Sequence, residues 1–301
     1  MLGWLVYSKQ DIDKNQRYIE FYREEGKLLD MEINLILAED LTFGVRKNHF
    51  FMDHSQEKTK LPDFVICRTI FPLLSKQFES MSIPVFNSSH VAEICNDKAR
   101  TYQYVAQLGI PMVESFFYKN NKIADLINHI EKPTIIKAVE GHGGSQVFLL
   151  NPVDSTNVES TEKKQRVLER LKNSDIVLQP LIGHKHQDLR VYVIGKTIIA
   201  AILRTAKEGF KSNFSLGGEV EQYVLSENEI QLVNKIINHF DFGLVGIDFI
   251  IGDQGELIFN EIEDVVGARM LYQCTDINLV RLYLGYIKEN LKNQLIDLEN
   301  L

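Results

Sequence analysis

The sequence predicts a mixed α/β protein, because short apolar runs alternate along it with longer amphipathic stretches. The run Phe64–Cys67 is continuous and apolar, which is typical of a buried parallel strand. Residues 13–29 carry apolar side chains at helical spacing, between strand-like runs at 5–7 and 32–37. This strand–helix–strand beginning predicts a small Rossmann-like α/β domain at the N-terminus.

Composition and charge exclude several classes of protein. Of the 301 residues, 45% are hydrophobic and 25% are charged, as in an ordinary globular protein. The formal net charge is -8, and the sequence has no cluster of basic residues of the kind that nucleic-acid-binding proteins carry. Cys67, Cys95 and Cys274 lie far apart, which predicts neither a disulfide framework nor a zinc site. No apolar run approaches the length of a membrane span, and residues 1–7 have no charged leader. We therefore expect a cytoplasmic protein without nucleic-acid or membrane partners.

The middle of the chain predicts a helix and then a glycine-rich loop between two strands. Apolar residues recur at helical spacing over 91–105, which predicts one continuous helix. Apolar runs at 134–139 and 147–150 flank the glycine-rich loop as strands. A helix over 164–171 and a strand over 176–178 follow.

The last third of the chain predicts two hairpins and a capped helix. Gly195-Lys196 joins strands at 190–194 and 197–203, and glycine in first place is what a type II′ turn requires. Ser226 and Glu229 have the spacing of a capping box at the start of a helix. The remaining expected elements are a hairpin of strands 245–251 and 256–263 and a helix over 276–291.

A lysine before the glycine-rich loop is the first indication of chemistry. Lys137 interrupts an apolar strand, and burying an ammonium is costly unless an anion meets it. Gly141, Gly143 and Gly144 let the backbone approach a phosphate closely. A tight turn beside a lysine that extends to solvent is an equally good interpretation of these residues alone. Neither the Rossmann glycine pattern nor a P-loop fits, so a different nucleotide fold is needed.

Three carboxylates in the second hairpin are the other indication. If the turn closes symmetrically, Ile251 pairs with Glu256 and Asp248 opposes Phe259. This register places Asp248 on the same face of the hairpin as two acids of the second strand. A divalent cation commonly relieves the repulsion between clustered carboxylates, and magnesium suits such a set. A solvated acidic face is the alternative. The acids that would share the face with Asp248 are Glu261 and Glu263.

Eight short stretches between 87 and 272 carry a further pattern. They are Asn96-Asp97-Lys98, Ile136-Lys137-Ala138-Val139-Glu140-Gly141, Asp188-Leu189-Arg190-Val191, Arg204-Thr205-Ala206-Lys207-Glu208-Gly209, Ser212-Asn213, Gly217-Gly218, Gly246-Ile247-Asp248 and Glu261-Ile262-Glu263. In their order and spacing, the segment resembles the RimK-type carboxylate-amine (glutamate) ligases of the ATP-grasp superfamily. The region before it resembles the family's preceding α/β domain, including Arg68 after the strand at 64–67.

The resemblance implies an ATP-grasp fold and a nucleotide site. Its implied domains are 1–88, an α/β domain that precedes the ATP-grasp module, 89–180 with the glycine-rich lid, and 181–301 with the metal site. Lys98 and Lys137 would neutralise the phosphates of ATP beneath the lid. The residues that would complete the nucleotide site are Gly141, Gly143 and Gly144 in the lid, Gln179, Pro180, Leu181 and Ile182 at the adenine, and Asp188 at the ribose.

The resemblance also implies a metal and a reaction. Asp248, Glu261 and Glu263 match the positions that hold Mg²⁺, with Mn²⁺ as an alternative ion. A substrate carboxylate would take the γ-phosphoryl group, and an amine would attack the acyl phosphate. The substrates would be small molecules or peptides, and a homo-oligomer is an open alternative to a monomer. The residues implied near the γ-phosphate and the acyl group are Arg190, Arg204, Lys207 and Asn213.

Departures from the family pattern leave the substrate and the reaction class open. Thr205 and Leu216 replace arginines that lie near the acyl substrate in the family, and Arg269 is a candidate to supply one missing charge. His142 lies in the glycine-rich loop with no assigned role, while a solvated loop is the favoured interpretation of His184 and His186. A regulatory ATP-binding protein without turnover and a small-molecule kinase are the alternatives to a ligase.

Overall fold

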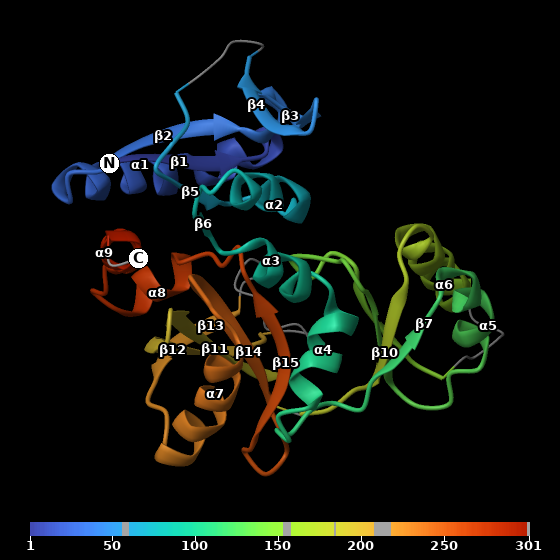
Figure 1. Ribbon diagram of the computed structural model, residues 1–301. Coiled ribbons are helices and arrows are strands. Elements are labelled where there is room, and N and C mark those ends of the chain that lie inside the picture. The colour runs from blue at the N-terminus through green and yellow to red at the C-terminus, as the bar shows by residue number, and fades with distance from the viewer. Residues whose placement is uncertain (56–59, 153–157, 184, 208–217, 300–301) are drawn as a thin grey trace.

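A parallel sheet forms the N-terminal part of the protein. The computed structural model describes residues 1–55, 60–152, 158–183, 185–207 and 218–299. Four parallel strands in the order β2-β1-β5-β6 form the first sheet, and the helices α1 and α2 pack on its opposite faces (Figure 1). The predicted Rossmann-like beginning is therefore present. The elements are β1 (Leu2–Tyr7), α1 (Ile12–Leu28), β2 (Glu32–Leu37), β5 (Phe64–Cys67), α2 (Pro72–Ser80) and β6 (Val85–Phe86).

Two further strands that the sequence pattern did not indicate follow β2. They form an antiparallel hairpin of β3 (Leu41–Arg46) and β4 (His49–His54). Lys47 and Asn48 have positive φ angles of 50° and 65°, as the tight connection of such a hairpin requires. Figure 1 shows the hairpin beside the first sheet, at the end of the molecule opposite α7.

The second sheet carries the lysine and the glycine-rich loop. Its antiparallel strands run in the order β7-β10-β8-β9, and apolar residues of α5 and α6 pack against it. The loop joins β8 to β9, so the predicted strand, loop and strand are confirmed. The elements are β7 (Phe116–Tyr118), α5 (Ile123–Asn128), β8 (Thr134–Ala138), β9 (Val147–Leu150), α6 (Val158–Leu171) and β10 (Ile176–Pro180).

The third sheet is antiparallel, with strand order β13-β12-β11-β14-β15. Alternate residues of β11 point to opposite faces, where α7 covers one side and α8 and α9 cover the other. Among the residues that the structure describes, no helix is both long and apolar enough to cross a membrane. The elements are β11 (Gln187–Ile194), β12 (Thr197–Thr205), β13 (Glu219–Tyr223), α7 (Glu227–His239), β14 (Leu244–Ile251), β15 (Leu257–Glu263), α8 (Arg269–Cys274) and α9 (Leu279–Glu299).

The continuous helix expected over 91–105 is wrong, because the chain forms two helices there. They are α3 (Ser89–Cys95) and α4 (Lys98–Ala106). The side chain of Asp97 accepts a hydrogen bond from the Arg100 N–H at 2.8 Å and so caps α4 as a separate helix. The break places Lys98 in the first turn of α4, where its own N–H donates at 3.0 Å to the carbonyl of Val139, the residue that follows β8.

The turn chemistry of the third sheet agrees with the sequence. Gly195 has a φ of 58° between Ile194 and Thr197, which pair directly across the predicted type II′ turn. The capping box is also confirmed, because Ser226 and Glu229 exchange both of its hydrogen bonds.

The register predicted for the second hairpin is wrong by one residue at the turn. Ile251 pairs with Leu257 instead of Glu256, and Phe249 pairs with Phe259. The ladder then shifts between Phe249 and Asp248, which leaves one extra residue in β15. Because of this bulge Asp248 lies directly opposite Glu261, so the two acids share a face for a reason that the sequence pattern did not contain.

Candidate active site

Residues from all three sheets line one cavity of about 610 Å³. The cavity lies where β8 and its glycine-rich loop approach the ends of β11, β12 and β15. The residues predicted for the site that line it are Lys98, Lys137, Gly141, Gly143, Gly144, Gln179, Pro180, Leu181, Ile182, Asp188, Arg204, Glu261 and Glu263.

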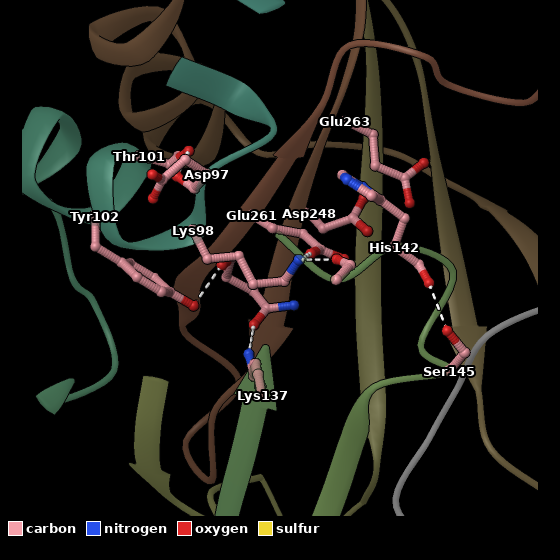
Figure 2. Close-up of polar contacts among 12 residues, drawn as sticks. Asp97, Lys98, Thr101, Tyr102, Lys137, His142, Ser145, Asp248, Glu261 and Glu263 are labelled. Atoms are coloured by element: carbon pink, nitrogen blue, oxygen red, sulfur yellow. Dashed lines mark hydrogen bonds and ion pairs between the residues drawn. The ribbon is translucent and has the colours of Figure 1, made fainter. Parts of the chain in front are cut away.

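Two lysines from different elements extend toward the same part of the cavity (Figure 2). Lys98 is 7% exposed, its Nζ lies 3.4 Å from Glu261 Oε2, and it also donates to the Gly141 carbonyl. Lys137 on β8 donates to Oδ1 of Asn260 at 2.9 Å. Burial lowers the pKa of Lys137 to about 8, although Glu261 acts in the opposite direction. Both ammonium groups therefore point at a small region in which an anion would be stabilised.

The glycine-rich loop has a backbone that other residues would adopt only with strain. Gly143 and Gly144 have φ angles of 62° and 71°, and a Cβ built at Gly143 would meet no atom within 4 Å. Ser145 donates its hydroxyl to the His142 carbonyl at 3.1 Å within the loop. Burial, assisted by Lys98, lowers the pKa of His142 to about 4, so its imidazole is neutral at pH 7. This open loop fits a phosphate group, because backbone N–H groups can approach it closely.

The segment after β10 forms another wall of the cavity. Gln179 is 2% exposed and donates to the Ser115 hydroxyl at 2.8 Å, which fixes the end of the strand. The Leu181 N–H donates to the Pro133 carbonyl at 3.1 Å, so this donor is used within the protein. Recognition of an adenine base by the backbone would therefore depend on the carbonyl of Pro180 and the N–H of Ile182, two of the residues that the family resemblance places at the adenine.

Three carboxylates meet on the adjoining face of the third sheet. One ligand atom from each of Asp248, Glu261 and Glu263 lies within 4.8 Å of the other two. Octahedral Mg²⁺ with oxygen ligands at about 2.0–2.1 Å needs its oxygens closer to one another than this limit. The set therefore fits a hard divalent cation in its ligand chemistry, and small side-chain movements would bring the three oxygens to the required spacing.

Arginines already neutralise much of this acidic cluster. Arg190 binds both oxygens of Asp248, with its Nε 2.7 Å from Oδ1 and its Nη2 2.6 Å from Oδ2, and Arg204 Nη2 lies 2.7 Å from the same Oδ2. Burial alone would raise the pKa of Asp248, but the two guanidinium groups lower it to about 2. Arg190 also lies 2.8 Å from Glu263, whose pKa is nevertheless raised by burial. Glu261 and Glu263 thus remain the carboxylates that face the cavity.

The sequence profile of the RimK-like ATP-grasp domain matches residues 95–287, more than half of the chain. The chain belongs to the RimK-like ATP-grasp family. The two lysines, the glycine-rich loop and the three acids of this RimK-like chain all lie within the matched segment.

Relatives of this RimK-like chain include proteins of similar length. It is 28% identical to the "Uncharacterized protein MG011" of Mycoplasma genitalium over 97% of this chain and 96% of the relative. It is 29% identical to a "Probable alpha-L-glutamate ligase" of Legionella pneumophila over 72% of this chain and 71% of that protein. Its fold is similar to that of the ATP-grasp ligase PsnB complexed with Mg and ADP, at a TM-score of 0.65 and 17% identity, over 95% and 97% of the two chains. The predicted family, the mixed α/β ATP-grasp fold and the class of ATP-dependent ligase are confirmed.

Two residues predicted to be catalytic lie away from the cavity wall, and a third falls outside the described residues. Arg190 lies behind the wall and holds Asp248, so it positions an acid. Lys207 is exposed and lies 3.7 Å from Glu219, and it does not line the cavity. Asn213 and His184 lie outside the described residues. Arg269 is exposed but does line the cavity, and His186 lines it as well.

Sequence reasoning missed Asn260, which is the extra residue of the bulge in β15. Its side chain accepts from Lys137, and its carbonyl accepts from the Tyr102 hydroxyl at 2.6 Å. It also missed Asp264, a buried acid that follows the metal-site strand and lines the same cavity. The only signal for Asn260 was a polar residue inside a strand, which is too common to indicate a bulge.

Proposed function

We propose that this protein uses ATP and Mg²⁺ to join a carboxylate to an amine through an acyl phosphate. The observation that carries the proposal is that two buried lysines line the same cavity as two members of a three-carboxylate cluster, whose ligand atoms lie within 4.8 Å of one another. Cations suited to phosphates and acids suited to a divalent ion are both needed for phosphoryl transfer. A site that only stored a nucleotide would not require both.

Each wall of the cavity has a proposed role in binding ATP. Lys98 and Lys137 would bind phosphate oxygens, and the loop with Gly141, Gly143 and Gly144 would cover them. Gln179, Pro180, Leu181 and Ile182 would border the adenine, and Asp188 would accept the ribose hydroxyls. Asp248, Glu261 and Glu263 would hold Mg²⁺, which when bound would supply positive charge against the transferring phosphoryl group.

The proposed reaction has two steps. An oxygen of the substrate carboxylate attacks the γ-phosphorus, and the bond to the β-phosphate oxygen breaks to release ADP. The nitrogen of the amine then attacks the acyl carbon, inorganic phosphate leaves, and the nitrogen loses a proton. Arg204 lines the cavity and would face the transferring group, while Arg190 keeps Asp248 in position behind it. The roles of Lys207 and Asn213 stay predictions.

The division of the chain into 1–88, 89–180 and 181–301 is part of this proposal. The strands of each sheet fall within one of these ranges, since the first sheet ends at Phe86 and the second at Pro180. The cytoplasmic location and the absence of nucleic-acid partners stay predictions, as does the open choice between a monomer and a homo-oligomer.

An ADP-release assay on the purified protein tests the proposal against paired carboxylates and amines. We expect ADP release over many turnovers only when Mg²⁺, an acid and an amine are all present. ADP release that needs the acid alone would indicate the small-molecule kinase, and ATP binding without any ADP release would indicate the regulatory protein.

The Glu261→Gln variant tests the metal site within the same assay. We expect ADP release to fall by at least about 100-fold, because an amide removes one charge from the cation site. The matched control is Glu221→Gln, an exposed acid on β13 of the same sheet, which should keep full activity. Undiminished turnover by Glu261→Gln would remove Glu261 from the site.

A further inference from the structure

Arg68 is a buried cation at the end of a parallel strand. It directly follows β5, and ligands of parallel sheets commonly bind beyond the carboxyl ends of the strands. The residue is 6% exposed, yet it lines the 610 Å³ cavity and also an adjoining cavity of about 600 Å³. The guanidinium is therefore buried in protein on one side and faces open space on the other.

Arg68 forms no ion pair with the residues that the structure describes, although its charge partly offsets the rise that burial causes in the pKa of Asp264. No carboxylate oxygen of these residues lies within 4.0 Å of it, whereas Arg190 and Arg204 both bind Asp248. Its Nε is 3.4 Å from the Tyr7 hydroxyl, and its Cζ lies 5.3 Å from the centre of the Tyr18 ring. These neutral groups orient the guanidinium but do not balance its charge, and a buried unpaired cation is costly.

The surroundings of Arg68 can accept a ligand with both an anionic and a donor group. Asn96, 9% exposed, and the partly buried Asn15 line the same part of the cavity with neutral polar side chains. Asp264 is 7% exposed, and its Oδ1 has no hydrogen-bond partner among the described residues. A buried acceptor of this kind calls for a donor. Asp264 follows Glu263 directly, so this region adjoins the proposed metal site.

We propose that Arg68 binds a carboxylate group of a substrate, and that this carboxylate takes no part in the reaction. Oδ1 of Asp264 accepts a hydrogen bond from the same substrate. The inference rests on the proposed ligase function, because it places the second charged end of a substrate. Arginine suits this role, since its planar fork binds a carboxylate through two parallel hydrogen bonds. It is also an alternative source of positive charge in a sequence that has Thr205 and Leu216 instead of the family's arginines.

Two sources could provide this carboxylate. It belongs either to the amine substrate, which is then an amino acid, or to the acid substrate, which is then a dicarboxylic acid. Titration calorimetry of the full chain saturated with Mg²⁺ and ADP distinguishes them, with glycine and L-alanine in one arm and succinate and glutarate in the other. We expect heat of binding in one arm, and its loss when the carboxylate of that probe is replaced by a carboxamide.

The Arg68→Met variant tests the residue. We expect the probe that binds the wild type to bind roughly 10- to 100-fold more weakly, with unchanged affinity for ADP and an unfolding temperature no lower than that of the wild type. Arg68→Lys, which keeps the charge without the fork, should bind the probe with intermediate affinity. Arg23→Met, at an exposed position on α1 outside both cavities, is the matched control and should bind as the wild type does.

Several outcomes would overturn the inference. The first is that Arg68→Met binds the probe as tightly as the wild type does. The second is that Arg68→Met binds ADP more weakly than the wild type. The third is that the wild type binds ADP but none of the probes. A protein that binds a probe through Arg68 but never releases ADP with any acid and amine would keep the subsite and refute the ligase reaction instead.

Discussion

Lys137 is a buried cation whose hydrogen-bond partner is neutral. Its Nζ donates to Asn260, and burial lowers its pKa from 10.5 to about 8. A lysine whose pKa is lower in the folded state destabilises that state while it is charged. The cost is fully present below pH 8 and disappears as the pH rises from 8 through 10.5, because the unfolded chain then holds a proton that the folded protein has released. In the absence of nucleotide, Lys137 thus lowers stability.

Replacing Lys137 with methionine should stabilise the nucleotide-free protein while it abolishes ATP binding. The shift in pKa corresponds to about 3 kcal/mol at pH 7, and we expect a higher unfolding temperature in calorimetry. The difference from the wild type should shrink between pH 8 and pH 10. Lys132→Met, at an exposed position before β8, is the control and should change neither quantity. A lower unfolding temperature for Lys137→Met at pH 7 would contradict the argument.

Individual residues could be predicted from sequence where their chemistry conflicts with their surroundings. Lys137 lies in an apolar strand and is followed by a cluster of glycines, so the sequence pattern identifies both the lysine and the glycine-rich loop. Asp264 and Asn260 give no such conflict, because a lone polar residue near a strand end has no distinctive pattern. Their importance depends on which other strands lie beside them, and that information is contained in the fold alone.

At the level of helices and strands, the sequence predicted those features that depend only on interactions between neighbouring residues. The capping box at Ser226 and the type II′ turn at Gly195 involve only neighbouring residues, and both are present. The break between α3 and α4 depends partly on the hydrogen bond from the Lys98 N–H to the carbonyl of Val139, which follows β8 and is distant in the sequence. The bulge at Asn260 depends on how β15 fits against β14 and on a contact with Tyr102. Neither feature could be obtained from periodicity.

The bulge in β15 makes a prediction about nucleotide binding. In Asn260→Asp, a new carboxylate would lie beside Lys137 and Glu261 and repel the phosphates of ATP. We expect ATP affinity to fall roughly tenfold or more, as measured by calorimetry with Mg²⁺ present. Asn260→Ala removes the acceptor without adding charge and should show a smaller loss. Equal affinities for the two variants would mean that charge at this position does not matter.

At the level of the whole molecule, one hydrophobic core extends from the first sheet to the third. Leu5, Tyr7 and Ile19 pack in the same cluster as Leu279 and Tyr283. At the edge of this core, Arg281 Nε lies 2.6 Å from Oε2 of Glu25, which joins α9 to α1. The N-terminal α/β unit therefore supports the sheet that carries the acidic cluster, in addition to contributing Arg68 to the cavity.

A shortened protein that begins at residue 89 should not fold stably by itself. Its α8 and α9 would expose the apolar residues that α1 and the first sheet cover, and large exposed apolar patches promote aggregation. We expect aggregates in gel filtration and a broad thermal transition in circular dichroism. Production together with residues 1–88 as a separate chain should restore a compact complex. A monomeric residue 89–301 protein with a sharp transition would contradict this expectation.

The ion pairs around the three carboxylates have a consequence for the kinetics of nucleotide capture. The cations Lys98, Lys137, Arg190 and Arg204 balance the anions Asp188, Asp248, Glu261 and Glu263 one for one, within a chain whose net charge is -8. Because this cluster is balanced and the whole chain is acidic, the cluster exerts no long-range attraction on an incoming polyphosphate. Encounter would then proceed by unassisted diffusion, and discrimination would begin only after the nucleotide reaches contact distance and displaces the internal partners of the lysines.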